Sequence, residues 1–499
     1  MESWNRIIHT ALLGTNKKSF ARDEAEPTLA SYVDEVIAAT PDKEEQFLQL
    51  AALHYNYRQC GLSPVHNDKA IIEPAPEEEK QYAPPAAHRA LSAVLEAGSA
   101  SLLNYWLEHC AEKDLIVQPE AITSLLDAVI RQKPLQALAL DCCGYRGTWL
   151  ARFNTAWAYG SREEEDDAWQ TGTLEQRKTF LARIRSQDPA QARTLLQEAW
   201  PQENAAARTE LIKQLSINAG ADDLPWLETL LADKSAKVKE AVTTLLKSIP
   251  ASSIVQAYWK IVQSALRLKK ERGLLGLTSK DVLVFDAPGP IDESIYKSGI
   301  EKVSSEKNSS DDAFLLYQLM LHIPPSFLQA HLGIDRQQII KLLLQSAEGQ
   351  QLLMAIGQAA IRFDDRAWMQ AVITADSKNF YPDALGFLPQ PEAEAYALRF
   401  IDTPGAVVTV IDRATQFGQE WSPQFASAVL AFTSQQPYQY HRSFYSEIIH
   451  LLPPAITPEL DRFMPKEDYQ KHIWNGVREE IKKLLALKLE TRKAFKENI

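Results

Sequence analysis

Residues 223–250 read DLPWLETLLADKSAKVKEAVTTLLKSIP, and this stretch decides the fold. Leu227, Leu230 and Leu231 form an apolar stripe at helical spacing, and a second stripe follows Asp233. The second stripe comprises Val238, Ala241, Val242, Leu245 and Leu246. A small alanine lets the paired helix approach closely, and Asp233 can accept hydrogen bonds from the free amides that open the second helix. The pattern predicts two helices packed as a pair.

The same pattern recurs upstream in FLARIRSQDPAQARTLLQEAW, residues 180–200. The two copies align without gaps when Phe180 is set against Trp226, an offset of 226 − 180 = 46 residues. HEAT and armadillo repeats have periods of about 40 to 47 residues. The unit resembles the HEAT repeat, with a leucine-rich first helix, a turn aspartate, and a valine–lysine pair and alanine in the second helix. In the upstream copy the aspartate is displaced by one position, to Asp188, and a helix over 205–217 leaves the exact pairing of helices open.

The whole chain is therefore expected to be all-α, an α-solenoid of HEAT- or armadillo-like helix pairs. We expect an N-terminal helical segment (1–62), a Pro/Glu-rich linker (63–85), a helical domain (86–270) with HEAT-like repeats at about 174–249, an irregular insertion (271–312) and a C-terminal helical domain (313–499). A long helix is predicted over 251–270. In 277–299 the run DVLVFD and the Pro-Gly-Pro turn predict a short extended or β-like insertion.

Composition narrows the classes of function. The formal net charge of −12 and the pI near 5.5 repel nucleic acid on average, so binding it would need a locally basic face. Four irregularly spaced cysteines do not form a disulfide framework, which favours a reducing compartment. The N-terminal residues lack the apolar core of a secretory signal, and the chain has no run of about 18 apolar residues. A soluble, cytoplasmic protein without a membrane segment is expected.

The sequence shows no complete motif for catalysis or metal binding. HExxH and CxxC are absent, and the adjacent His109 and Cys110 point about 100° apart on a helix. Cys142 or Cys143 could pair with a distant histidine as nucleophile and base, but LALDCCGY is more typical of a helix with buried cysteines that ends at glycine. The acidic run EEEDDAW (163–169) lacks calcium-loop spacing and is either a solvated connection or an acidic protein-binding patch. We expect no catalytic residue, no cofactor and no metal.

CCGYRGTWLARFNTAW (142–157) concentrates unusual residues in an otherwise plain helical sequence. Its aromatic and leucine side chains, at Trp149, Leu150, Phe153 and Trp157, recur on one helical face. Two glycines release the preceding helix, so the segment is predicted to be a joint between helices. Arg146, Arg152 and Trp149 are the residues predicted to contact a partner.

YQYHRSFY (438–445) gathers four aromatic residues around His441 and Arg442. Aromatic residues with arginine are typical of interface hot spots, but they also seal helix junctions. His441, Arg442 and Tyr445 are therefore predicted as a second group of partner-binding residues.

An alternative is a nucleic-acid-binding protein or an enzyme like the helical-repeat DNA glycosylases, which grip DNA with a basic concave face. This alternative is based on the basic residues Arg146, Arg152, Arg177, Arg183, Arg185, Arg193, Lys237 and Lys239. Acidic residues such as Glu175, Asp188 and Glu240 alternate with them, as on an ordinary solvated helix surface. Nucleic acid is the less favoured partner.

Four segments carry a resemblance over most of the chain: SWNRIIHTALLGT, GYRGTWLARFN, TLEQRKTFLARIRSQDP and DDLPWLETLLADKSAKVKEAV. The chain resembles a family of uncharacterised bacterial proteins of unknown function, whose genes tend to lie near MoxR-type AAA+ ATPases, von Willebrand factor A proteins and SWIM zinc-finger proteins. The resemblance implies a protein partner of the AAA+ ATPase or von Willebrand factor A type and assigns no catalytic residue. The predicted function is a non-enzymatic scaffold or adaptor between proteins. The oligomeric state stays open.

Overall fold

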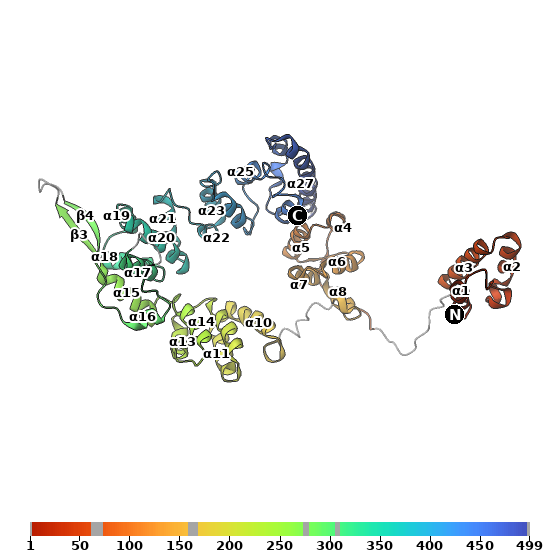
Figure 1. Ribbon diagram of the computed structural model, residues 1–499, viewed down its shortest axis with the longest axis horizontal. Coiled ribbons are helices and arrows are strands. Elements are labelled where there is room, and N and C mark those ends of the chain that lie inside the picture. The colour runs from red at the N-terminus through yellow and green to blue at the C-terminus, as the bar shows by residue number, and fades with distance from the viewer. Residues whose placement is uncertain (1, 61–72, 158–167, 273–278, 305–309, 497–499) are drawn as a thin grey trace. The chain divides into compact units, whose positions relative to one another are not determined.

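The computed structural model describes residues 2–60, 73–157, 168–272, 279–304 and 310–496. Residues 163–167 of the acidic run and residues 63–72 of the predicted linker therefore lie outside the described residues. The chain divides into two compact units, Met1–Pro74 and Ala75–Ile499. The described residues are predominantly helical (Figure 1).

The first unit is a small helical module. Its elements are α1 (Glu2–Leu13), η1 (Arg22–Glu24), η2 (Pro27–Leu29), α2 (Ala30–Ala39) and α3 (Lys43–Cys60). Its core is small, and its buried apolar residues are Ile7, Phe20, Leu29, Val33 and Leu50. α3 packs against both other helices. A module this small buries a smaller share of its apolar surface than a larger domain does.

The second unit begins with a helical group. Its elements are β1 (Gln81–Tyr82), α4 (Pro85–Ala97), α5 (Ala100–Glu112), β2 (Leu115–Ile116), η3 (Pro119–Ala121), α6 (Ile122–Val129), α7 (Lys133–Cys142), α8 (Gly144–Ala151) and η4 (Thr155–Trp157). Ser99 caps α5 and Gly98 ends α4 in the left-handed conformation, as the glycine–serine boundary in the sequence indicates. The short strands β1 and β2 pair in parallel.

A second group of helices has a core of its own. Its elements are α10 (Leu174–Gln187), α11 (Pro189–Ala199), η5 (Trp200–Gln202), α12 (Ala205–Ile212), η6 (Lys213–Ser216), η7 (Ala221–Asp223), α13 (Leu224–Leu230) and α14 (Ala236–Leu246). α10 packs on α11 and α13 packs on α14. The 46-residue offset therefore relates two pairs of consecutive helices, while α12 packs between α10 and α14.

The turn aspartates have different roles in the two pairs. Asp188 is the N-cap of α11 and accepts a hydrogen bond from the Gln191 amide at 2.9 Å. Asp233 accepts from the Ser235 amide at 2.7 Å, and it is Ser235 that caps α14. Both carboxylates stabilise the start of the second helix, Asp188 as the cap itself and Asp233 from two residues before the cap.

The long helix predicted over 251–270 is confirmed over 253–265 and is wrong over 266–270. α15 (Ser253–Ala265) ends where β3 (Leu266–Arg272) begins, and β3 pairs antiparallel with β4 (Ser279–Phe285), which contains most of the DVLVFD run. LRLKKER has good helix formers, but Leu266 and Leu268 alternate with polar residues and find apolar partners across the hairpin. Cross-strand pairing overrides local helix propensity here.

Helices make up the described remainder. They are α16 (Glu293–Lys297), α17 (Asp311–Met320), α18 (Pro325–Leu332), α19 (Arg336–Leu343), α20 (Ala347–Arg362), α21 (Arg366–Ala375), α22 (Ala384–Phe387), α23 (Gln390–Leu398), α24 (Val407–Ala414), α25 (Pro423–Thr433), α26 (Arg442–Ile448), η8 (Pro454–Arg462) and α27 (Asp468–Ala494). The last helix, α27, packs against α4 and α5 at the start of the same unit. Among the described helices, none combines the length and apolar character needed to cross a membrane.

Candidate binding pocket

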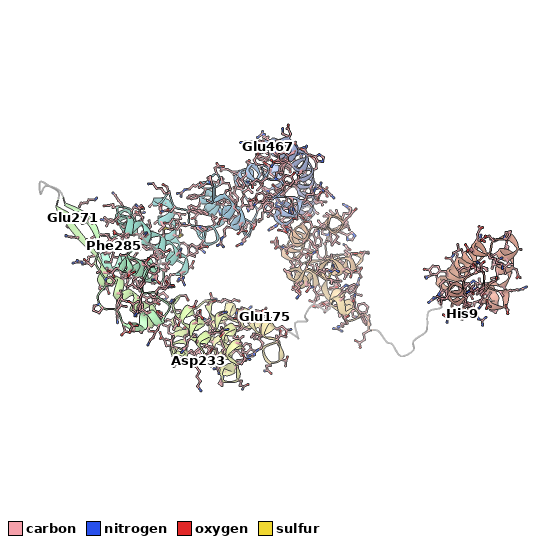
Figure 2. All side chains as sticks on the ribbon, in the orientation of Figure 1. His9, Glu175, Asp233, Glu271, Phe285 and Glu467 are labelled. Atoms are coloured by element: carbon pink, nitrogen blue, oxygen red, sulfur yellow. The ribbon has the colours of Figure 1, made fainter. Side chains whose placement is uncertain are left out.

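A pocket of about 400 Å³ lies where the β hairpin meets two helix N-termini. It is lined by the end of β4 and by the first turns of α17 and α20. Phe285 stands at the base of the hairpin and Glu271 towards its tip (Figure 2). The volume is in the range of sites that accept a small molecule or a single large side chain.

The floor of the pocket is apolar. Leu283, Leu316 and Leu352 are buried members of the main core, and Phe285 packs against that core. β4, α17 and α20 all contribute to these residues, so the hairpin and both helices must be in place for the floor to exist. The floor would accept the aliphatic part of a side chain or ligand.

The rim of the pocket is acidic. It carries Asp286, Asp312 and Glu348. Asp286 accepts a hydrogen bond from Arg267 across the hairpin, and this bond lowers the pKa of the Asp286 carboxyl. Asp312 and Glu348 are exposed and, within the described part of the chain, form no ion pair. Both lie in the first turn of a helix, where the helix dipole favours a negative charge.

No cluster of three or more histidine, cysteine, aspartate or glutamate side chains suited to a metal ion occurs among the described residues. Oxygen ligands of a divalent cation must converge within about 2.0–2.6 Å of one point. Acids spread around an apolar floor instead match a larger cation with an aliphatic stem, such as an arginine or lysine side chain.

Comparison with known proteins places the chain in a family. The model of a family of unknown function (DUF5691) matches residues 6–499. The chain belongs to this family. No curated protein and no solved structure matched it. The family's description assigns no activity, so the function of this DUF5691 member has to be inferred from its own residues.

Arg146, Trp149 and Arg152 lie on or directly after α8 of this DUF5691 member. The Glu78 carboxylate accepts hydrogen bonds from the backbone amides of Tyr145 (3.0 Å) and Arg146 (2.8 Å). Arg152 is exposed, whereas Trp149 is half-buried, with its ring 4.9 Å from that of Phe153. Glu78 thus anchors the start of α8 to the acidic segment before α4, a contact that the sequence did not reveal.

Gly144 explains how that anchor can form. Its φ is +64°, and a Cβ atom built on it would lie 2.4 Å from a Glu78 carboxylate oxygen. Glycine is therefore required both for the left-handed turn and for the close approach. This geometry gives 142–157 a defined turn, and the apolar residues Leu150 and Trp157 pack against the main core.

His441, Arg442 and Tyr445 lie at the start of α26. His441 is the N-cap residue, its ring accepting from the Ser443 amide, and Arg442 is exposed beside Gly476 of α27. Tyr445 is buried, and its hydroxyl donates to Thr433 at 2.7 Å. Of the three, Tyr445 belongs to the core, and only the first two side chains are accessible.

The cysteines and the basic residues also have defined surroundings. Burial raises the pKa of the Cys143 thiol, which disfavours a thiolate nucleophile there. Arg177 pairs with Glu203 at 2.5 Å, and Arg185 and Arg193 both pair with Asp223. Three of the arginines that raised the nucleic-acid alternative therefore already have acidic partners.

The pocket itself was not predicted. Asp286 ends the DVLVFD run, but Asp312 was part of a polar stretch without an assigned role, and Glu348 was not singled out. The sequence does contain one usable signal, the two serine caps. The Ser310 and Ser346 hydroxyls each accept a hydrogen bond from the backbone amide three residues further along the chain, and an acidic residue follows each serine in the first turn of the helix. That these two turns face one another depends on long-range packing.

Gly349, beside this pocket, gives a first prediction. A Cβ atom there would lie 2.1 Å from the Leu343 carbonyl oxygen, a backbone atom that cannot move aside cheaply. We expect Gly349→Ala to lower the free energy of unfolding by about 2 kcal/mol, despite the higher helix propensity of alanine. Gly386 in α22 is the matched control, because a Cβ there meets nothing within 4 Å. Urea unfolding should show a loss for the first variant only; equal effects would contradict the steric argument.

Proposed function

We propose that this protein is a non-enzymatic helical adaptor that binds other proteins, and that the pocket at the base of the hairpin receives an arginine or lysine side chain of a partner. The single observation that carries the proposal is the pocket's chemistry, an apolar floor beneath the carboxylates of Asp286, Asp312 and Glu348. A cation with an aliphatic stem satisfies both parts at once.

The architecture supports an adaptor. We infer that the helix pairs α10–α11 and α13–α14 are HEAT-like units of an α-solenoid, because one 46-residue offset relates them. Solenoids present an extended surface in which each unit supports its neighbour, a geometry suited to protein recognition. We also propose that the protein is bacterial and cytoplasmic. The family resemblance supports the bacterial origin, and the four free cysteines support a reducing compartment.

A MoxR-type AAA+ ATPase or a von Willebrand factor A protein is the proposed partner. This part rests on the family resemblance alone. Whichever of these proteins is the partner, the segment that enters the pocket must carry a basic side chain to match the acidic rim.

The second prediction tests the pocket by reversing its charge. We expect the Asp312→Lys/Glu348→Lys variant to recover about tenfold less partner than the wild type in affinity purification from native cells, because two lysines repel the incoming cation. The matched control is Asp402→Lys/Asp412→Lys, which changes the net charge equally at exposed carboxylates outside the pocket lining. Equal losses in both variants would indicate a general charge effect and contradict the proposal.

A photo-crosslinking residue locates the contact. Gln351 lines the pocket, whereas the adjacent Gln350 is equally exposed but does not line it. We expect a crosslinker at 351 to capture partner peptides that contain arginine or lysine near the attachment point, and one at 350 to capture fewer. Capture from both positions alike, or of peptides without basic residues, would sink the proposed binding mode.

A further inference from the structure

Three basic side chains gather around one buried tyrosine of the second unit. The tyrosine is Tyr258, in α15. The Lys247 ammonium lies 5.9 Å from the centroid of its ring, and the His322 ring lies at 5.9 Å, centroid to centroid. Arg362 donates from Nε to the carbonyl oxygen of Leu321, the residue before His322, at 3.1 Å. Lys247, His322 and Arg362 therefore form a basic cluster, although they are far apart in the sequence.

The basic cluster forms where three helices end. Lys247 is the C-cap residue of α14, His322 follows the C-cap residue of α17, and Arg362 is the last residue of α20. α15 packs on α14 and α17, and α17 packs on α20, which brings these ends together. The helix dipole favours a cation at a helix C-terminus, so each residue alone has an ordinary structural role. The separate dipoles do not explain why the three residues converge.

The positive charges of the basic cluster are not balanced by acidic side chains. Within the described ranges, Lys247 contacts the tyrosine ring, Arg362 donates to a carbonyl group, and neither forms an ion pair. Burial and Arg362 lower the pKa of Lys247, and burial with both cations lowers the pKa of His322 to about 3. No carboxylate of the described residues raises either pKa. The chain has 65 acidic against 53 basic side chains, so carboxylates are not scarce.

The polar atoms of the basic cluster have capacity for a ligand. Arg362 is exposed and uses only one of its several N–H donors on the Leu321 carbonyl. The half-buried Lys247 ammonium donates no hydrogen bond to any residue that the structure describes. The Nδ1 atom of His322 is buried and has no hydrogen-bond partner among those residues. Buried polar atoms normally have partners, so this place is poorly satisfied by the protein's own groups.

We propose that Lys247 and Arg362 bind a phosphate group, free or carried by a small molecule, beside the His322 ring. His322 is neutral at pH 7, so two positive charges remain, and a phosphate monoester carries about −1.5 to −2 at that pH. A single carboxylate would balance only one of the two. The guanidinium can donate two parallel hydrogen bonds to phosphate oxygens, and the ammonium adds a point charge. None of the three residues lines the hairpin pocket, so the site is separate from the proposed protein contact.

Isothermal titration calorimetry of the full chain at neutral pH tests the site with inorganic phosphate, phenyl phosphate and acetate. We expect at least one of the phosphates to bind about tenfold or more tightly than acetate, whose single charge balances half of the cluster. Tighter binding of inorganic phosphate would support the free ion as the ligand, and tighter binding of phenyl phosphate would support an ester. Acetate binding as tightly as both phosphates, or no binding of either phosphate at millimolar concentration, would overturn the proposal.

Charge-removing variants locate the bound phosphate. We expect Lys247→Gln and Arg362→Gln each to weaken phosphate binding about tenfold, with circular dichroism unchanged. The matched controls are Lys239→Gln on α14 and Arg366→Gln at the start of α21, both at exposed positions. Each control removes one positive charge near the cluster in sequence and should leave the affinity unchanged. Equal losses in variants and controls would mean that phosphate responds to overall charge, which would refute a specific site.

The His322 ring provides a readout in the unaltered chain. Phosphate bound beside this ring should shift its proton resonances in NMR spectra, and these resonances are assigned by their loss in the His322→Asn variant. His441, on the surface at the start of α26, serves as the internal control and should not respond. If the His322 resonances stayed in place at saturating phosphate, the phosphate would be bound elsewhere and the proposed site would be wrong.

Discussion

The Glu420→Gln variant is expected to unfold with a free energy about 3 kcal/mol below that of the wild type. Lys488, in α27, has a fully buried side chain, and its ammonium lies 2.8 Å from the Glu420 carboxylate. Arg492 donates to the same carboxylate and, at 3.0 Å, to the Tyr105 hydroxyl of α5. Loss of the carboxylate charge leaves a buried ammonium without its counter-ion, which weakens the contact between α27 and α5.

The pH dependence identifies Lys488 as the cause. Burial lowers its pKa to about 8, and Glu420 opposes this effect by raising it. The unfolded chain, with a lysine pKa near 10.5, binds more protons between these values, so stability rises with pH across this window. Without the Glu420 charge the folded pKa falls further. The rise in stability should therefore begin at a lower pH in the variant.

Urea unfolding at a series of pH values, with hydrogen exchange of α5 and α27, measures both effects. Glu490→Gln is the matched control, since Glu490 is exposed on the same helix and its loss should change stability by no more than about 0.5 kcal/mol. Faster exchange confined to α5, α27 and the segment around Glu420 is expected. An equal loss in both variants, or no shift of the pH profile, would contradict a specific buried pair.

Local features were predictable because they depend on neighbours in sequence. The glycine stop at Gly98, the cap at Ser99 and the helix pair around Asp233 each follow from interactions within a few residues. The strand over 281–285 was indicated by its β-branched residues. Its partner, Leu266–Arg272, was not, because a sequence of leucine, lysine, arginine and glutamate fits a helix until a strand is available to pair with it.

Contacts between remote segments could not be predicted from one sequence. Tyr105 and Arg492 are 387 residues apart, and neither has a local feature that marks it as a partner. The pocket depends in the same way on β4 meeting α17 and α20. Arg185 is the clearest case: in the sequence it alternates with acids, as surface arginines do, yet its side chain is fully buried.

We expect Arg185→Met to lower the free energy of unfolding by about 4 kcal/mol, since it takes one of two arginines from a buried carboxylate and leaves several carbonyl groups without their donor. Arg185 forms a two-point contact with Asp223, at 3.1 and 2.5 Å. It also donates to the carbonyl oxygens of Pro189, Leu215, Ile217 and Asn218. One side chain therefore joins α10 to the starts of α11 and α13 and to the turn after η6.

Two comparisons isolate this network. Arg183→Met, at an exposed position of the same helix, should cost less than about 1 kcal/mol. Arg185→Met/Asp223→Leu removes the carboxylate that has lost Arg185 as well, so it should be less damaging than the sum of the single variants. Stability is measured by urea unfolding, with hydrogen exchange over α10 to α14 as the local readout. Additive single effects would mean that the two side chains do not act as a pair.

Acid titration independently tests how the charge of Asp223 contributes to stability. Burial alone would raise the pKa of Asp223, but hydrogen bonds from Arg185 and Arg193 outweigh it and lower the pKa below its usual 3.8. The stability contributed by this carboxylate is present above pH 3.8 and is lost as the pH falls through the lowered pKa. Arg193, which lies 2.8 Å from the Asp223 carboxylate in the wild type, is retained in the Arg185→Met variant. The difference in unfolding free energy between the wild type and Arg185→Met should therefore narrow as the pH falls below 3.8. A difference that stayed constant would mean that Arg185 stabilises the fold by packing and carbonyl contacts rather than by its charge.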